Sequence, residues 1–473
     1  MLPLVIPSAS EESVLVAARG VALPAPSPGC YTSCREWHAK GRGMADQAAI
    51  REERALLAGE LTDERAIDSG PPTARKGTFH AVIHYRQFRY IWTAGVITQL
   101  GQWFQSVAIG WLALILTNSP SFVGQVGFAS GVPILLLSFP AGALLDRIDR
   151  RRALLATQIV GALLALGIAY VNWQGKMQPW HLLVAAVLNG VLLAFVQPAT
   201  QSLAPSLVPR EDLPNALALS SAGNSSTRII GPSLAGVLIG VLGIAGCYLA
   251  QAITFLAAAL MTGLVRVPRD TRANAALGGG VFEGLRVIRR DPTLTGLLLL
   301  ASAPALLAYP YIQLLPVFAR DVLHLGPRGL GIIMSTSGIG AFTGALIVAR
   351  LGAWPHKGRL TLIVGIIYGF VLTAFALSPW PIASGLVLVV SGFFGSVFYS
   401  TNQILVQLAT SDAMRGRVMG ALAVSFGLMP VGSLFIGTLA QRIGAPLAVT
   451  SGALASSCCV ALIALRYRTL WRL

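Results

Sequence analysis

The sequence predicts an all-α membrane protein with twelve transmembrane helices in two parallel six-helix repeats. Three observations support this prediction. First, hydrophobic residues make up 54% of the 473-residue chain and charged residues only 11%, which is the composition of a protein solvated mainly by lipid. Second, many apolar stretches reach the length of about 20 residues that crosses a bilayer. Third, short glycine-containing motifs recur in the two halves of the chain.

Residues 1–87 differ from the remainder because they contain no apolar stretch long enough to span a membrane and no signal-peptide pattern. We expect them to form a disordered cytoplasmic extension; a translation start at Met44 is an equally good interpretation of the first part. Cys30 and Cys34 lack the second ligand pair that a zinc site needs. The sequence therefore predicts neither a bound metal nor a cofactor.

From Tyr90 onward, twelve apolar spans follow one another. A backbone in lipid has to satisfy its own hydrogen bonds, so helices are the expected form of these spans. The expected limits are 90–116, 121–145, 153–172, 180–204, 215–240, 244–265, 294–318, 328–350, 361–378, 382–408, 417–440 and 445–466.

The distribution of Lys and Arg predicts the orientation in the membrane. These residues gather beside the N-terminus, beside the C-terminus and in the connections that follow even-numbered spans. The opposite side holds only Lys176, Arg320, Arg328 and Arg442. By the positive-inside rule, both termini are cytoplasmic in an inner (plasma) membrane. The net charge of +16 does not indicate nucleic-acid binding, because the basic residues flank apolar spans instead of alternating with aromatic ones.

Two motif pairs mark an internal repeat. Gly142-Ala-Leu-Leu returns as Gly344-Ala-Leu-Ile, and Gly231-x4-Gly236-x-Leu returns as Gly432-x4-Gly437-x-Leu. Parallel duplicated halves are typical of a transporter that rocks about a central site.

The repeat divides the chain into an N-terminal six-helix bundle at 88–265, a cytoplasmic linker at 266–292 and a C-terminal six-helix bundle at 293–473. Within the linker, the apolar spacing at 281–290 fits a surface helix on the inner leaflet. A plain linker helix fits it equally well.

The connection after span 2, Gly142-x3-Asp146-Arg147-x2-Arg150-Arg151, resembles the 2–3 loop motif of the major facilitator superfamily, with Asp149 in place of the usual second glycine. Further stretches are similar to the branch of enterobactin exporters, macrolide-efflux-like proteins and transmembrane secretion effectors: Gln197-Pro-Ala-Thr, Arg228-Ile-Ile-Gly-Pro232, Leu315-Pro-Val-Phe-Ala-Arg320-Asp321 and Arg415-Gly-Arg417-Val. The resemblance implies export by alternating access, with spans 1, 4, 7 and 10 around a central cavity and with proton antiport as an energy source.

The 2–3 loop is the expected cytoplasmic gate. Asp146, at the end of span 2, can accept hydrogen bonds from the unpaired amides at the start of span 11, where the helix dipole favours a carboxylate. Arg417 at the same helix start is its expected ion-pair partner. The arginines of the loop either bind lipid head groups and neighbouring carbonyls or only set the topology. The predicted gate comprises Gly142, Asp146, Arg147, Arg150, Arg151, Arg415 and Arg417.

Arg228 is the one charged residue expected well inside a span. Because a charge at this depth is costly, it marks a functional site by default. One interpretation is that it binds an anionic substrate such as a carboxylate or a catecholate. The other is that it supports a helix kink at Gly231, Pro232 and Gly236.

Amides and aromatic side chains are expected to face a cavity suited to an amphipathic organic molecule. Hydrogen bonding between packed helices is an equally good explanation for each of them. The predicted cavity residues are Gln99, Gln102, Trp103, Gln197, Gln201, Asn224, Arg228, Tyr309, Gln313, Tyr399, Asn402 and Gln403.

The sequence thus predicts a monomeric exporter of small siderophore-like or drug-like molecules, with membrane lipid, the substrate and protons as its partners. No carboxylate is expected in the middle of a span, so coupling would involve Asp146, Asp149 and Asp321 at the interfaces or the substrate's own protonation, or would not exist. A lipid or lysolipid flippase of the same fold and a non-transporting sensor or scaffold are the alternatives. An enzyme is not expected, because the chain shows no paired nucleophile and base and no phosphate loop.

Overall fold

The computed structural model describes residues 79–145, 148–203, 207–266, 291–350, 355–411 and 414–473. The N-terminal extension with Met44, Cys30 and Cys34 lies almost entirely outside these residues, as do Asp146, Arg147 and the linker segment 281–290. In the described part the secondary structure is helical throughout.

The first bundle follows a short helix, α3 (His80–His84). Its long helices are α4 (Arg86–Thr117), α5 (Pro120–Leu145), α6 (Arg150–Trp173), α7 (Pro179–Leu203) and α8 (Leu213–Gly263). α8 contains two spans, because Gly243 interrupts it with a φ of 73°. Glycine has no Cβ and adopts this left-handed angle without strain.

The second bundle contains two interrupted spans. α10 (Pro292–Leu307), α11 (Tyr311–Val317) and the π-helical turn η3 (Phe318–Val322) form span 7, and α15 (Arg415–Phe426) and α16 (Met429–Ile443) form span 11. The uninterrupted spans are α12 (Pro327–Arg350), α13 (Lys357–Leu377), α14 (Pro381–Leu408) and α17 (Ala445–Arg466), which a short turn, η4 (Arg468–Arg472), follows.

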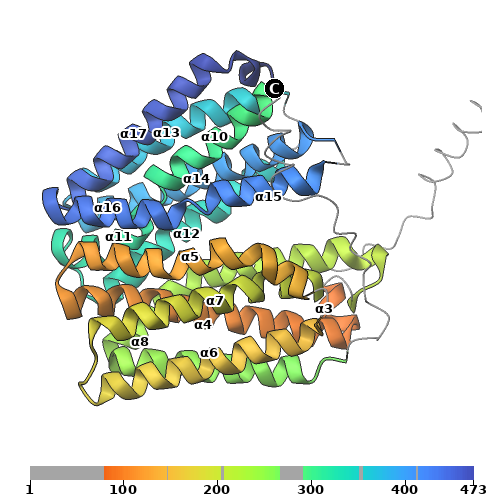
Figure 1. Ribbon diagram of the computed structural model, residues 1–473, viewed down its shortest axis with the longest axis vertical. Coiled ribbons are helices and arrows are strands. Elements are labelled where there is room, and N and C mark those ends of the chain that lie inside the picture. Colours follow the sequence, from red (N-terminus) through yellow and green to blue (C-terminus); the bar gives the residue numbers. More distant parts are fainter. Residues whose placement is uncertain (1–78, 146–147, 204–206, 267–290, 351–354, 412–413) are drawn as a thin grey trace, which may run out of the picture. The chain divides into compact units, whose positions relative to one another are not determined.

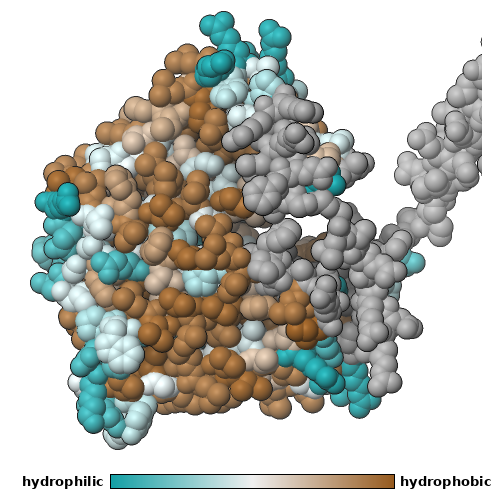
Figure 2. All heavy atoms as spheres, in the orientation of Figure 1, coloured by the Kyte–Doolittle hydropathy of each residue, from teal (hydrophilic) through white to brown (hydrophobic). Residues whose placement is uncertain are grey.

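These helices confirm the predicted twelve-helix architecture. Within the described residues, 11 helical segments are long and apolar enough to cross a membrane, and the division of α8 at Gly243 makes twelve crossings. Figure 1 shows the two bundles side by side. Apolar side chains cover most of the face seen in Figure 2, and hydrophilic ones gather at its margins. The face seen in Figure 2 is therefore suited to contact with lipid.

Side-chain caps fix several helix ends. The Asp149 carboxylate accepts hydrogen bonds from the backbone amides of Arg151 (2.9 Å) and Arg152 (3.4 Å) and so begins α6. Asp149 has a φ of −62°, an ordinary angle, so no glycine-like conformation is needed at this position. It stands in the loop motif as a helix N-cap, a role that aspartate fills well.

The repeated glycine motif has a packing role. A Cβ on Gly236 of α8 would come within 2.5 Å of the Pro327 carbonyl on α12, and one on Gly437 of α16 would come within 2.8 Å of the Gly124 Cα on α5. The motif therefore lets helices of opposite bundles approach closely at two equivalent seams, α8 with α12 and α16 with α5. We call these contacts the glycine seams.

The predicted kink at Gly231, Pro232 and Gly236 stays a prediction. Pro232 lies inside α8, and the one described residue of α8 with non-helical backbone angles is Gly243, between spans 5 and 6. Gly231 and Gly236 allow neighbouring helices to approach closely. A Cβ on Gly231 would be 2.7 Å from the Cβ of Trp103, and Gly236 lies in a glycine seam.

Candidate functional site: a cavity between the bundles

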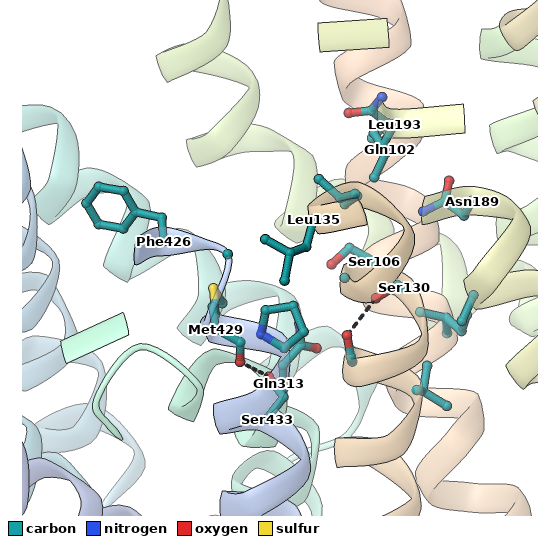
Figure 3. A pocket seen from close by; sticks show the side chains of 18 of the residues that line it. Gln102, Ser106, Ser130, Leu135, Asn189, Leu193, Gln313, Phe426, Met429 and Ser433 are labelled. Atoms are coloured by element: carbon teal, nitrogen blue, oxygen red, sulfur yellow. Dashed lines mark hydrogen bonds between the residues drawn. The ribbon is translucent and has the colours of Figure 1, made fainter. Parts of the chain in front are cut away.

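A cavity of about 840 Å³ lies between α4, α5 and α7 of the first bundle and α11, α14, α15 and α16 of the second. Its wall is mainly apolar, and none of its lining residues, all of them described, carries a charge. Polar groups are few and uncharged. The amides are Gln99, Gln102, Gln105, Asn189 and Gln313, several of which Figure 3 shows around the cavity.

Five of the predicted cavity residues line this space: Gln99, Gln102, Trp103, Gln313 and Tyr399. Three of them come from α4, where the spacing of 99, 102 and 103 puts them on one helix face. Gln313 belongs to α11 and lies across from α5, because a Cβ on Gly127 would be 3.1 Å from its side chain. The cavity is thus shared by both bundles.

Other predicted cavity residues are placed elsewhere. Asn402 is fully buried, and its Nδ2 donates a 3.2 Å hydrogen bond to the Leu297 carbonyl. The Tyr309 hydroxyl donates to the Gly395 carbonyl at 3.2 Å. Both bonds join helices of the second bundle, as the alternative of interhelical bonding expects.

Five predicted residues remain. Gln403, Asn224 and Arg228 are described but do not line the cavity wall. The backbones of Gln197 and Gln201 belong to α7, and their side chains are outside the description.

One end of the cavity is closed by contacts between the bundles. Arg320 in η3 donates from Nη1 to the Leu114 carbonyl (3.2 Å) and from Nη2 to Asn118 Oδ1 (2.6 Å), at the end of α4. Asp321 pairs with the same guanidinium at 2.5 Å. The Leu114 carbonyl also accepts a 2.8 Å hydrogen bond from the Asn118 amide, and the partial negative charge at this helix C-terminus favours a guanidinium. We call this group, Arg320 with Leu114 and Asn118, the Arg320 latch.

A second cross-bundle contact adds to the same end. The Ser119 hydroxyl donates to Gln441 Oε1 at 2.8 Å, which joins the start of α5 to the end of α16. Sequence reasoning missed Arg320, Asn118, Ser119 and Gln441 as a gate. The available signal was the rarity of cations on this side, where Arg320 is one of four.

The opposite end carries the predicted gate. Arg151 donates to the Thr262 carbonyl (3.2 Å) and to the Gly263 carbonyl at the end of α8, so it binds neighbouring carbonyls within its own bundle. Arg417 Nη1 contacts the Met414 sulfur at 3.3 Å. The pairing of Asp146 with Arg417 lies outside the description and stays a prediction.

The rest of the predicted gate is described only in part. Gly142 lies in α5, Arg150 is the first residue of α6 and Arg415 is the first of α15. The side chain of Arg415 is outside the description.

The helices around the two ends pack differently. α5 packs along α16, whereas α15 packs against α10 and α14 of its own bundle. In Figure 1, α5 and α15 diverge from the level of α16 onward. The described cross-bundle contacts therefore close the cavity at the Asn118 end only.

Two six-helix bundles that share one cavity and meet tightly at one end of it define a membrane transporter of the major facilitator type. The chain belongs to the transmembrane secretion effector family, whose model matches residues 78–470. This confirms the resemblance seen in the sequence, and it groups the protein with transporters and not with enzymes.

Curated relatives cover most of the chain. The staphyloferrin A transporter of Staphylococcus aureus is 25% identical over 75% of this chain and 90% of its own length. The multidrug efflux pump Tap of Mycolicibacterium fortuitum is 26% identical over 74% of this chain and 88% of its own. Macrolide efflux protein A of Streptococcus pyogenes is 24% identical over 76% of this chain and 90% of its own.

A solved structure agrees with the fold. The nucleoside transporter NupG superposes with a TM-score of 0.64 at 14% sequence identity, over 82% of this chain and 99% of its own. At this identity the similarity concerns the fold alone.

Proposed function

We propose that the protein exports small amphipathic organic molecules, siderophore-like or drug-like, across the inner (plasma) membrane by alternating access. The observation that carries the proposal is the neutral cavity of about 840 Å³, apolar with a few amides and closed at one end. A mostly apolar wall with few polar groups suits a ligand that is itself mostly apolar. The relatives named for staphyloferrin A, macrolide and multidrug efflux support this substrate range.

The direction of export rests on the orientation. With both termini in the cytoplasm, the Arg320 latch closes the outer end and the cavity is offered to the cytoplasm, where an exporter loads. The bundles then rock about the cavity, so that the Asp146 and Arg417 latch closes the cytoplasmic end when the outer end opens. We propose a monomer, because one chain supplies both bundles and the cavity between them.

If protons drive transport, the group that binds and releases them is a carboxylate at a membrane interface or an acidic group of the substrate. No carboxylate lines the described cavity wall. Asp146, in the cytoplasmic latch, is the carboxylate whose protonation would weaken a closed end, whereas Asp321 pairs with Arg320 within η3 and does not join the two bundles. A proton gradient would then drive transport by loosening the cytoplasmic latch.

The test is uptake into inside-out vesicles that contain the purified protein, with a panel of fluorescent amphipathic compounds. Accumulation above that of protein-free vesicles, increased by an imposed pH gradient, is expected for some members. If folded protein moves none of them, export of this class is wrong. If instead only labelled lysolipids or phospholipids change leaflet, the protein is a flippase. A protein indifferent to Asp146→Asn in every transport assay would be a sensor or scaffold.

A further inference from the structure

We infer that the transported molecule carries an acidic group and that Arg228 binds this group while the apolar body of the molecule occupies the neutral cavity. The inference rests on the proposed export function and specifies its substrate class. The acid could be a carboxylate, catecholate, phosphate or sulfonate, all of which match a guanidinium.

Arg228 faces the interior of the protein from the middle of a span. It lies halfway along the part of α8 that precedes Gly243. Ile230, Leu234 and Val237 are exposed at 52%, 41% and 48% and mark the lipid-facing side of this helix. With about 100° between successive helical residues, Arg228 lies on the nearly opposite side. Its side chain is nevertheless exposed, so it faces the space between the bundles.

No described protein group neutralises this charge. Arg228 forms neither an ion pair nor a hydrogen bond with another described residue; the ion pairs found there involve His80, Arg152 and Arg320. The described carboxylates all lie at helix ends: Asp149, Glu211, Asp212, Asp291 and Asp321. A guanidinium that braced a helix kink would donate to backbone carbonyls, and this one donates to none in the described chain. An arginine kept at membrane depth without a counter-ion is costly unless a ligand supplies the negative charge.

Arg228 lies beside the neutral cavity. Trp103 lines the cavity and packs against Gly231, which is less than one helical turn from Arg228. On the other side, a Cβ on Gly338 of α12 would be 2.8 Å from the Arg228 carbonyl, so α8 meets the second bundle at Arg228. One molecule of amphipathic shape can therefore reach both the cavity and the guanidinium.

Aromatic side chains suit the same ligand. Trp103 and Tyr399 line the cavity, and aromatic rings pack well against an aromatic or apolar body. Because the cavity wall is uncharged, discrimination by charge depends on Arg228. A cationic ligand of the same shape would be repelled there without compensation.

The test uses three pyrene probes of the same body: pyrenebutanoate, pyrenebutanol and pyrenebutyltrimethylammonium. Their binding to the full chain in lipid nanodiscs is measured by energy transfer from tryptophan. We expect the wild type to bind the anion at least about 10-fold more tightly than the alcohol, and the cation most weakly. Arg228→Gln should weaken binding of the anion about 10- to 100-fold and change that of the alcohol less than about 2-fold.

Two further variants complete the test. Arg228→Lys keeps the positive charge but loses the two-pronged guanidinium geometry, so its affinity for the anion should be intermediate. Arg442→Gln, outside the cavity, should bind the three probes as the wild type does. Retained binding of the alcohol shows that Arg228→Gln is folded. The inference is overturned if the wild type binds none of the probes or binds all three equally, or if Arg228→Gln weakens all three alike.

Vesicle uptake of the same probes separates this inference from the export proposal. Transport without charge preference contradicts the anion site and leaves export standing. Binding that prefers the anion without transport of any probe contradicts export and leaves the anion site standing.

Discussion

The two ends of the cavity differ in how the chain closes them. At the Asn118 end, both glycine seams bring opposite bundles into backbone contact, and the Arg320 latch ties span 7 to the end of α4. At the other end the sequence places many arginines, yet the described contacts of Arg151 stay within one bundle. The first end is closed by shape complementarity and by the partly buried Arg320, whereas the second end carries many arginines in the sequence.

Under the proposed alternating access, one chain does not close both ends at once. α5 and span 11 contribute to both: Gly124 meets Gly437 near the Asn118 end, while Arg417 lies at the opposite end of span 11 and Asp146 follows the last described residue of α5 in the sequence. Close-packed interfaces are bistable, not continuously deformable. If the helices tilt to bring one pair of ends together, the other pair separates. Substitutions at the two ends should therefore differ in the size and in the sign of their effects.

The largest effect is expected at a glycine seam. Gly437→Leu places a side chain where even a Cβ would be 2.8 Å from the Gly124 Cα, and overpacking of this kind costs about 1–3 kcal/mol or more. We expect loss of vesicle transport although the variant still inserts in the membrane. Gly167→Leu is the matched control, because a Cβ there meets nothing within 4 Å; equal loss in both variants would contradict a role for the seam.

The next largest effect is expected at the Arg320 latch. Arg320→Gln removes two charge-assisted bonds to α4, worth about 1.5–3 kcal/mol in total, and should shift the population toward the outward-open state about 10- to 100-fold. A cysteine introduced by Ser106→Cys in the cavity then reacts faster with an impermeant maleimide added outside. Arg442→Gln should leave that rate unchanged. An unchanged rate in Arg320→Gln would show that the Arg320 latch does not hold the outer end closed.

An effect of opposite sign is expected at the predicted cytoplasmic latch. Asp146→Asn removes the carboxylate expected to close the inner end, so the outward-open state loses about 1–3 kcal/mol. Labelling of Ser106→Cys from outside should slow, and turnover should fall while membrane insertion is normal. Combining Asp146→Asn with Arg320→Gln should bring the labelling rate back toward the wild-type value. A double variant that is labelled as fast as Arg320→Gln alone would contradict opposing roles for the two residues.

The smallest effect is expected at the Ser119 contact. Ser119→Ala removes the exposed 2.8 Å hydrogen bond to Gln441 and the 3.2 Å bond that Ser119 Oγ accepts from the Phe122 amide within the same bundle; the cross-bundle bond is worth about 0.5–1.5 kcal/mol. Outside labelling of Ser106→Cys should therefore rise by no more than about 10-fold. A change as large as that of Arg320→Gln would mean that the hydrogen bond between α5 and α16, and not the guanidinium, holds the outer end.

The sequence predicted the helices well because their signal is local. Apolar length alone located all twelve spans to within a few residues, for example 382–408 against the observed Pro381–Leu408. The glycine motif also identified the halves, since close helix approach requires small residues in both of them. The boundary predicted between 240 and 244 contains Gly243, where the backbone of α8 leaves the helical angles.

The cavity was harder to predict for a physical reason. The face of α4 with Gln99, Gln102 and Trp103 follows from helical periodicity. Whether an amide such as Asn402 faces the cavity or bonds to a neighbouring helix depends on which backbone carbonyl lies opposite, here that of Leu297. The Arg320 latch likewise joins residues of different bundles, and a single sequence carries no record of that pairing.

The most direct test of the account measures both ends of the cavity in the same molecules. Pairs of spin labels are introduced into a protein without its native cysteines, at Ser121 and Arg442 for one end and at Ile148 and Ser411 for the other. Double electron–electron resonance then gives a distance distribution for each pair. With Arg320→Gln, the account predicts that the distance between Ser121 and Arg442 lengthens while that between Ile148 and Ser411 shortens. Distances that change in the same direction, or an outer end that opens without closure of the inner one, would contradict alternating access.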